Sequence, residues 1–273
     1  MANSARRAVV LSTHERVLNR ELAILDAAGI PLATNRWRGA LLALAARCLQ
    51  LQRVIHDAAA LGYEEELTPS ARAMLSALAT LAYIGRGRSF AERESRTLAW
   101  VQHQRASQDR LYEYLWRTGT PKKQIDSQQA EQTEASNAML AEAATRGVAP
   151  AKKVGKARTW TGLNEYELFS RVGYRRFYKH YYALWSDESH AGPTSVNSYV
   201  DQAAAGALSI GPQNTVPWFL LYATAQFGVH TLAQLNKLFR LKQDDAIRAL
   251  WGDIQTDFSK IIEAERAVEQ AAP

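Results

Sequence analysis

The clearest fold signal in this chain is the stretch NRWRGALLALAARCLQLQRVIHDAAALG, residues 35–62. Its apolar side chains recur at alternating steps of four and three, which places them on one stripe of an α-helix. The stripe consists of Trp37, Leu41, Leu44, Cys48, Leu51, Ile55 and Ala58. Asn35 belongs to a residue type that favours the N-cap, and Gly62 to the type that favours a helix end. The stretch therefore predicts a long amphipathic helix.

Helical periodicity continues through the rest of the chain, and the alternation typical of strands is nearly absent. Further helices are expected over residues 13–28, 68–84, 89–118, 120–147, 164–172, 174–190 and 216–241, and from 244 onward. The pattern predicts an all-α bundle of about eight or nine helices. We expect an N-terminal lobe (1–119), a polar helix with a basic linker (120–158) and a C-terminal lobe (159–273), the two lobes packing as one compact domain.

The composition is that of a globular protein, with 273 residues, 47% apolar residues and a net charge of +6. It excludes intrinsic disorder and a disulfide scaffold. The single cysteine, Cys48, cannot form an internal disulfide, which favours a reducing compartment and a cytoplasmic location. Its place in the apolar stripe favours a buried small side chain over a reactive thiol. No apolar stretch is long enough for a bilayer, and no motif indicates a cofactor or a metal.

Two hydrophilic segments follow one another in the middle of the chain. Residues 120–147 favour a helix that is polar almost all round, as in a helix that projects into solvent or contacts a partner, including a second copy of the chain. Residues 147–158 contain four cations and no acid: Lys152, Lys153, Lys156 and Arg158. This pattern is typical of an exposed, solvated basic loop, and contact with phosphate groups is the alternative.

The most informative helix is expected over residues 174–190, which are unusually aromatic. Tyr174, Phe177 or Tyr178, Tyr181 and Trp185 form one broad face that predicts core packing. Tyr182, Ser186 and His190 step by four, so a phenol, an alcohol and an imidazole line another stripe and can share hydrogen bonds. His190 is then either a group that satisfies free carbonyls at the helix end or a general acid/base in a pocket between helices.

One set of spaced residues resembles a known family. The set is Trp160, Gly173, Tyr178, Tyr182, Ser186 and His190. It looks like an uncharacterised all-helical bacterial family, domain of unknown function five-six-seven-seven (DUF5677). The segment from Arg72 to Ile84 resembles an earlier helix of that family, in which an Arg is followed four residues later by Glu; here that position is Ser76. The resemblance implies a helical fold and brings no established activity.

A second, weaker resemblance is to ribonucleases of the HEPN type, a helical superfamily that cuts RNA with an Arg, a spacer of four to six residues and a His. Arg175 and His180 fit this pattern with a four-residue spacer, although they would lie about 140° apart on an ideal α-helix. The pattern also fits two other pairs, Arg96 with His103 and Arg7 with His14.

Basic residues beside the Arg175–His180 pair are candidates for RNA contacts. They are Arg171, Arg175, Arg176 and Lys179, and the alternative is a solvated face of the aromatic helix. Three hypotheses for function result. The first is a helical binding or interaction protein, homo-oligomeric and of a kind that serves in bacterial defence or toxin systems. The second is an RNA-cleaving effector that uses Arg175 and His180, and the third is a hydrolase that uses Ser186 and His190.

Overall fold

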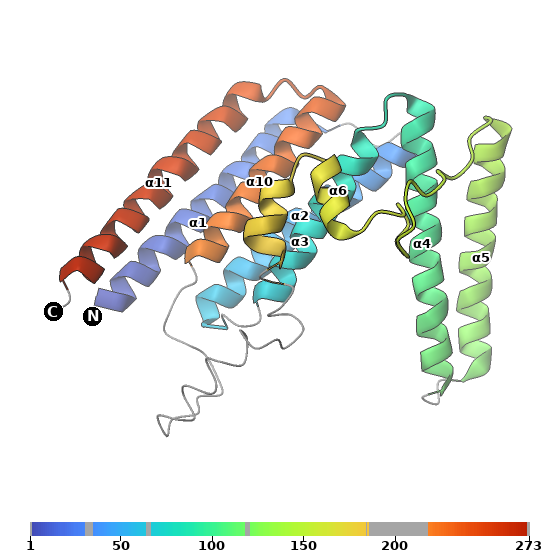
Figure 1. Ribbon diagram of the computed structural model, residues 1–273, viewed down its shortest axis with the longest axis horizontal. Helices are drawn as coiled ribbons and strands as arrows, with labels where there is room; N and C mark the ends of the chain where they lie inside the picture. Colours follow the sequence, from blue (N-terminus) through green and yellow to red (C-terminus); the bar gives the residue numbers. More distant parts are fainter. Residues whose placement is uncertain are drawn as a thin grey trace. The chain divides into compact units, whose positions relative to one another are not determined.

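The computed structural model describes residues 2–30, 35–63, 67–117, 121–183, 185 and 218–271. Every element of regular structure in this part of the chain is a helix, so the predicted all-α fold is confirmed. The long helices are α1 (Ala2–Ala28), α2 (Arg36–Leu61), α3 (Leu67–Gly85), α4 (Phe90–Arg117), α5 (Lys122–Thr145), α10 (Trp218–Phe239) and α11 (Asp244–Ala271) (Figure 1). None of these described helices has the length and apolar character that a bilayer-spanning helix requires.

Three short elements lie between α5 and α10 along the chain. They are α6 (Glu165–Arg171), α7 (Arg175–Phe177) and the π-helical turn η1 (Tyr178–Tyr182). Asn164 begins α6 with a reciprocal cap, in which its side chain accepts from the Glu167 N–H and its own N–H donates to the Glu167 carboxylate. The predicted helix over 164–172 is therefore confirmed and has a local cause.

The chain folds as two compact units, each made from stretches that are distant in sequence. The first comprises Met1–Ala33, Leu41–Ala82 and Tyr174–Pro273, and the second comprises Thr34–Ala40 and Tyr83–Gly173. Such units arise because an amphipathic helix buries its apolar face against whichever helix complements it, near or far along the chain. The expected lobe boundaries at residues 119 and 158 stay a prediction.

The stripe that predicted α2 lies in the core as expected. Six of its seven side chains are buried, and Leu41, Cys48 and Ile55 are fully so, while Ala58 is half-buried. Asn35 caps the helix by accepting from the Arg38 N–H at 3.2 Å. Gly62 follows the last helical residue with a φ of 87°, a conformation that glycine adopts without strain.

Helix α1 is longer than the sequence indicated, since it starts at Ala2 instead of residue 13. Val10 is 1% exposed, and the Arg7 guanidinium donates to the carbonyls of Ala59 and Ala60 at the end of α2. The early turns are thus held by contacts with a distant segment. Local periodicity misses them because these contacts are made with residues more than fifty positions away in the sequence.

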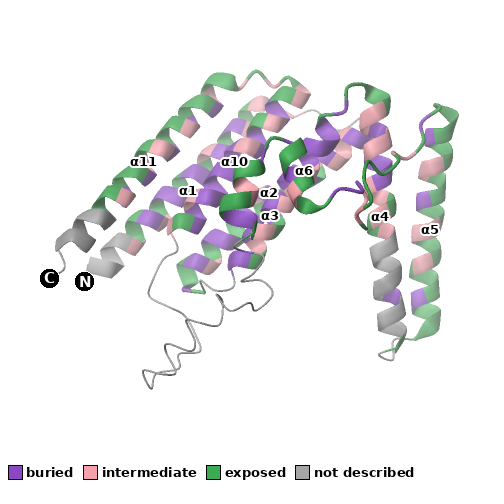
Figure 2. Ribbon diagram, in the orientation of Figure 1, coloured by how far each residue is buried: buried purple, intermediate pink, exposed green. Residues whose placement is uncertain are grey.

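The second unit contains α4 and α5, which run side by side (Figure 1). The polar helix predicted over 120–147 is confirmed as α5, and it packs on α4 through a narrow strip, with Ile125, Ser136 and Ala143 buried. Leu98 of α4 forms a small core with Ala143 and Val148, and most of the α5 surface is exposed (Figure 2).

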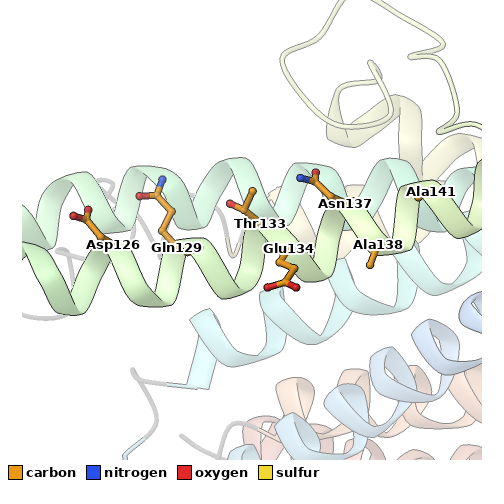
Figure 3. Close-up of a pocket in the computed structure, with 8 residues that line it drawn as sticks. Asp126, Gln129, Thr133, Glu134, Asn137, Ala138 and Ala141 are labelled. Carbon is orange, nitrogen blue, oxygen red and sulfur yellow. The ribbon is translucent and has the colours of Figure 1, made fainter.

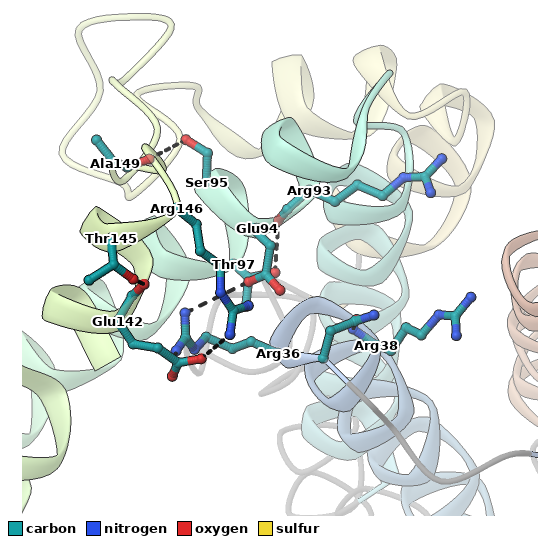
Figure 4. A network of polar contacts seen from close by, with 11 residues as sticks. Arg36, Arg38, Arg93, Glu94, Ser95, Thr97, Glu142, Thr145, Arg146 and Ala149 are labelled. Carbon is teal, nitrogen blue, oxygen red and sulfur yellow. Dashed lines mark hydrogen bonds and ion pairs between the residues drawn. The ribbon is translucent and has the colours of Figure 1, made fainter. Parts of the chain in front are cut away.

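An ion-pair network ties the first turn of α2 to this helix pair (Figure 4). The Arg36 guanidinium lies 2.7 Å from the Glu142 carboxylate of α5 and 3.9 Å from the buried Glu94 carboxylate of α4. Trp37 follows Arg36, and the Arg93 guanidinium lies 4.9 Å from the centre of the Trp37 ring. Buried carboxylates need such partners because an unpaired charge away from water is very costly.

The basic segment after α5 is exposed, as expected, and hydrogen bonds give it a fixed fold. The Val154 N–H donates to the Thr161 carbonyl at 2.7 Å, and the Ala157 N–H donates to the Gly162 carbonyl at 2.9 Å. The backbones of Gly155 and Gly162 approach so closely that a Cβ on Gly155 would lie 2.3 Å from the Gly162 oxygen. The cations of this loop, Lys152, Lys153, Lys156 and Arg158, are all exposed.

Candidate functional site

The aromatic segment predicted as one α-helix over 174–190 contains a π-helical turn. The Ala183 N–H donates to the Tyr178 carbonyl, five residues earlier, instead of four as in an α-helix. Such turns are rare and occur often at functional sites. Ser186 and His190 lie outside the described residues, so of the Tyr182, Ser186 and His190 set the structure places Tyr182.

Four aromatic side chains of this segment pack against α10, as predicted. Phe177, Tyr181 and Trp185 surround the fully buried Phe227 ring at centroid distances of 5.1, 5.6 and 6.0 Å. Tyr174 contacts the His230 ring edge-on at 5.4 Å, and burial lowers the pKa of His230. The aromatic face therefore anchors α7 and η1 to the first unit.

Tyr182 is 2% exposed and lies between two other side chains of the first unit. The Tyr178 ring stacks on it at 5.5 Å, and the Arg72 guanidinium of α3 lies 5.0 Å from the centre of its ring. Both Arg72 and Tyr182 are positions that carry the resemblance described above, and the fold brings them together. The half-buried Ser76 follows Arg72 by one turn and supplies no carboxylate.

The cationic side chains of the aromatic segment face solvent, unlike its aromatic rings. Arg175, Arg176, Lys179 and His180 are all exposed. His180 lies in the π-turn and Arg175 lies in the preceding α7, so the angle of about 140° that an ideal α-helix gives does not fully describe this pair. Arg171 is exposed and belongs to the second unit, where its carbonyl accepts from Arg86.

The arginines of the two other Arg/His pairs stabilise the fold. Arg96 donates to the Tyr83 carbonyl, and its guanidinium lies 4.4 Å from the centre of the Tyr83 ring. Arg7 is bonded to carbonyls at the end of α2, and His14 is completely buried. Burial, with help from His56 and Arg53, lowers the pKa of His14 to about 3. A buried neutral imidazole cannot reach RNA, so the Arg7–His14 pair is not a nuclease site.

His14 is part of a buried hydrogen-bonded chain that the sequence analysis missed. Its Nδ1 lies 3.3 Å from Nδ1 of His56, and its Nε2 lies 3.2 Å from the hydroxyl of Thr224. Because the Thr224 hydroxyl donates to the Leu221 carbonyl, it accepts from His14 Nε2–H. His14 Nδ1 then accepts from His56 Nδ1–H, which assigns the tautomers of both rings.

A second pair of buried polar side chains, Glu21 and Gln52, lies between the same helices α1, α2 and α10. We call these two residues, together with His14, His56 and Thr224, the polar seam. Gln52 donates to the Glu21 carboxyl at 3.4 Å, and both side chains are fully buried. Burial raises the pKa of Glu21 well above its usual value, against the opposing effect of this hydrogen bond. Gly228 of α10 makes room for the pair. The signal was present in the sequence as polar residues at helical spacing, His14 with Glu21 and Gln52 with His56, beside the apolar stripe.

The Cys48 thiol is buried and lies away from solvent. It is 0% exposed, its sulfur lies 3.6 Å from the Met74 carbonyl, and burial raises its pKa to about 12. The prediction of a buried small side chain is confirmed. Among the residues that the structure describes, no three His, Cys, Asp or Glu side chains are grouped as metal ligands.

A groove of about 750 Å³ follows the exposed side of α5 (Figure 3). Its described lining comes from that helix alone: Asp126, Gln129, Ala130, Thr133, Glu134, Asn137, Ala138 and Ala141. Two carboxylates and no cation contribute to this lining, so it disfavours phosphate groups. The groove fits the expectation that the polar helix meets a partner more than it fits a catalytic site.

Comparison with curated proteins and with solved structures found no match for this chain. The model of a family of unknown function, DUF5677, matches residues 38–207, which is more than half of the chain. The matched range includes both Arg72 and the aromatic segment with Tyr178 and Tyr182. The resemblance seen in the sequence is thus confirmed, and the chain belongs to the DUF5677 family of unknown function.

Proposed function

We propose that this protein is a helical binding protein that holds RNA on the exposed basic surface of α7 and η1. The observation that carries the proposal is the division of this short segment into two faces. Four of its aromatic rings contact α10, three of them buried (Tyr174, Tyr181 and Trp185) and Phe177 half-buried, while four side chains, Arg175, Arg176, Lys179 and His180, stay exposed. Anchored cations on a surface attract phosphate groups, which dominate the affinity of proteins for nucleic acids.

Salt dependence tests this proposal. Each phosphate contact to single-stranded RNA contributes a slope of about −0.7 to the plot of log affinity against log salt. The double variant Arg176→Ala/Lys179→Ala should therefore reduce the slope by about 1.4 and lower affinity about 25-fold near 0.1 M salt. Fluorescence anisotropy with a labelled RNA oligonucleotide measures both quantities.

A matched control removes one arginine and one lysine elsewhere in the first unit. Arg47 and Lys260 are exposed on α2 and α11, so Arg47→Ala/Lys260→Ala should bind RNA like the wild type. Equal losses in both variants would show that only net charge matters. Absence of RNA binding by the wild type would contradict the proposed function itself.

Cleavage of the bound RNA is the second candidate function, and the π-turn favours it. His180 is exposed in a π-helical turn, a geometry frequent at functional sites, and Arg175 is exposed in the preceding α7; cleavage would use His180 as general acid/base and Arg175 as phosphate-binding group. His180→Ala should then abolish cleavage while RNA affinity falls less than twofold. Growth arrest on expression, relieved by His180→Ala, would place the protein among defence or toxin effectors. Intact RNA in both cultures would exclude this activity.

Two earlier expectations stay predictions. The hydrolase hypothesis needs Ser186 and His190, and it predicts that Ser186→Ala abolishes ester hydrolysis. The interaction hypothesis predicts that the exposed side of α5 contacts a second copy of the chain. Light scattering should then give a dimer mass that Glu134→Arg in the α5 groove reduces to that of a monomer.

A further inference from the structure

The turn between α10 and α11 has an unusual backbone. At the end of helix α10, the Leu241 N–H donates to the Asn236 carbonyl at 3.2 Å. Arg240, which lies between the helix and Leu241, has a φ of 57°. Glycine is the preferred residue at this left-handed position after a helix. Lys242, two residues on, has a φ of 60°. Two long cationic side chains thus occupy positions at which a side chain is disfavoured.

Hydrogen bonds from one buried side chain hold this turn in place. Asn236 is 6% exposed; its amide oxygen accepts from the Gln243 N–H at 2.9 Å and its amide nitrogen donates to the Asp244 carboxylate at 2.9 Å. The Gln243 carbonyl accepts from the Ile247 N–H and starts α11. The turn is therefore rigid, and it holds the backbone of Arg240 and Lys242 in a fixed position.

A pocket of about 510 Å³ lies at this turn. Its described lining is Ala233, Asn236, Lys237, Arg240, Lys242, Asp244 and Ile247. Three of these side chains are cations and one is an anion, so the described lining has a net positive charge. Within the described part of the chain, no ion pair or side-chain hydrogen bond involves Lys237, Arg240 or Lys242, all of which are exposed. Their charges remain available to a ligand.

We propose that this pocket binds the phosphate groups of a small phosphorylated molecule of about nucleotide size. The volume lies within the range of small-molecule sites, which is about 300–1,000 Å³. Arg240 supplies a planar guanidinium that donates two parallel hydrogen bonds to a phosphate, and the two lysines supply point charges. Binding of phosphate would explain why Arg240 and Lys242 occupy left-handed positions at which glycine would carry less backbone strain. The site is separate from α7 and η1 and does not depend on the proposed RNA binding.

Glycine substitutions test the proposal, because ligand binding and folding should respond in opposite directions. Arg240→Gly and Lys242→Gly each remove a cation and also relax a left-handed residue. We expect each to weaken binding of adenosine triphosphate, measured by calorimetry without magnesium, about tenfold. The Tm should stay equal or rise by up to about 3 °C. A residue that served only the fold would lower the Tm when replaced.

Two further variants make the test sharper. Asp244→Asn keeps an oxygen that accepts from Asn236 but removes the one negative charge of the described lining, so affinity should rise about threefold. Lys260→Ala removes an exposed cation farther along α11 and should leave affinity unchanged.

Inorganic phosphate and an RNA oligonucleotide serve as additional probes of the same variants. Weak binding of inorganic phosphate that the glycine variants abolish would support the site. Three results would overturn it: no binding of adenosine triphosphate to the wild type, unchanged binding in both glycine variants, or an effect confined to RNA, which would assign these cations to a nucleic-acid surface.

Discussion

Gly228→Ala is the substitution for which the structure gives the most definite stability prediction. A Cβ at this position in α10 would lie 2.2 Å from Oε1 of Glu21 and 2.4 Å from Oε1 of Gln52. Both side chains are fully buried, so neither can move into solvent. Alanine would otherwise favour the helix by about 1 kcal/mol over glycine. The outcome depends on whether steric conflict outweighs that gain.

The opposing costs can be estimated separately. Forcing extra volume into a packed core costs about 1–3 kcal/mol. Displacing Glu21 from Gln52 breaks their hydrogen bond and leaves buried polar groups without partners, at about 1–3 kcal/mol. After subtraction of the gain in helix propensity, Gly228→Ala should lower the free energy of unfolding by about 3 kcal/mol. Urea unfolding followed by circular dichroism measures this quantity.

Gly252→Ala is the matched control, because Gly252 lies in α11 and its Cβ would meet no atom within 4 Å. This substitution should stabilise the protein by up to about 1 kcal/mol. Glu21→Ala combined with Gly228→Ala should cost less than the sum of the two single variants, since the carboxyl no longer opposes the methyl group. Equal stabilities of the two single glycine variants, or strictly additive losses in the double variant, would refute the packing argument.

The remaining predictions concern the polar seam and the Arg72–Tyr182 contact. His14 has a folded pKa of about 3 and an ordinary unfolded value of 6.5, so the unfolded state binds the extra proton and stability falls as the pH drops below 6.5. The slope should approach 1.4 kcal/mol per pH unit, and His14→Gln should flatten it in urea titrations between pH 7 and pH 5. The contribution of Glu21 to the pH dependence of stability has the opposite sign. Its folded pKa is raised above 4.5, so the folded state holds the proton and stability falls as the pH rises above 4.5. Glu21→Gln should remove this loss, and a variant less stable than the wild type at pH 8 would contradict it. Arg72→Met keeps the aliphatic stem and removes the cation over Tyr182; it should cost about 1 kcal/mol in urea unfolding, whereas no change would mean that the contact contributes nothing.

Sequence reasoning predicted those parts of the fold that have local causes. Helix α2 has an apolar stripe, an N-cap at Asn35 and a glycine end, all of which are readable within a single stretch. The first turns of α1 depend instead on the bond from Arg7 to the end of α2, more than fifty residues away. No local pattern contains that information, so the start of α1 was predicted about ten residues too late.

The candidate site shows the same division. Core packing of the aromatic face follows from its spacing, whereas its partner, α10, is found only in the folded structure. The π-turn does not follow, because neither the apolar spacing nor the residue types of this segment distinguish it from an α-helical turn. The approach of Arg72 to Tyr182 likewise joins two helices that the sequence separates.

The polar seam and the exposed sites are connected through α10. One face of this helix carries Thr224 and Gly228, which meet His14 and the Glu21–Gln52 pair, and the neighbouring face carries Phe227, on which η1 packs. A shift of α10 by one turn, about 5.4 Å, would separate Thr224 from His14 and place a side chain where only Gly228 fits. An all-apolar interface would tolerate such a shift more easily, because dispersion contacts have little directional preference. The seam thus fixes the register of α10, and with it the positions of the basic segment and of the turn before α11.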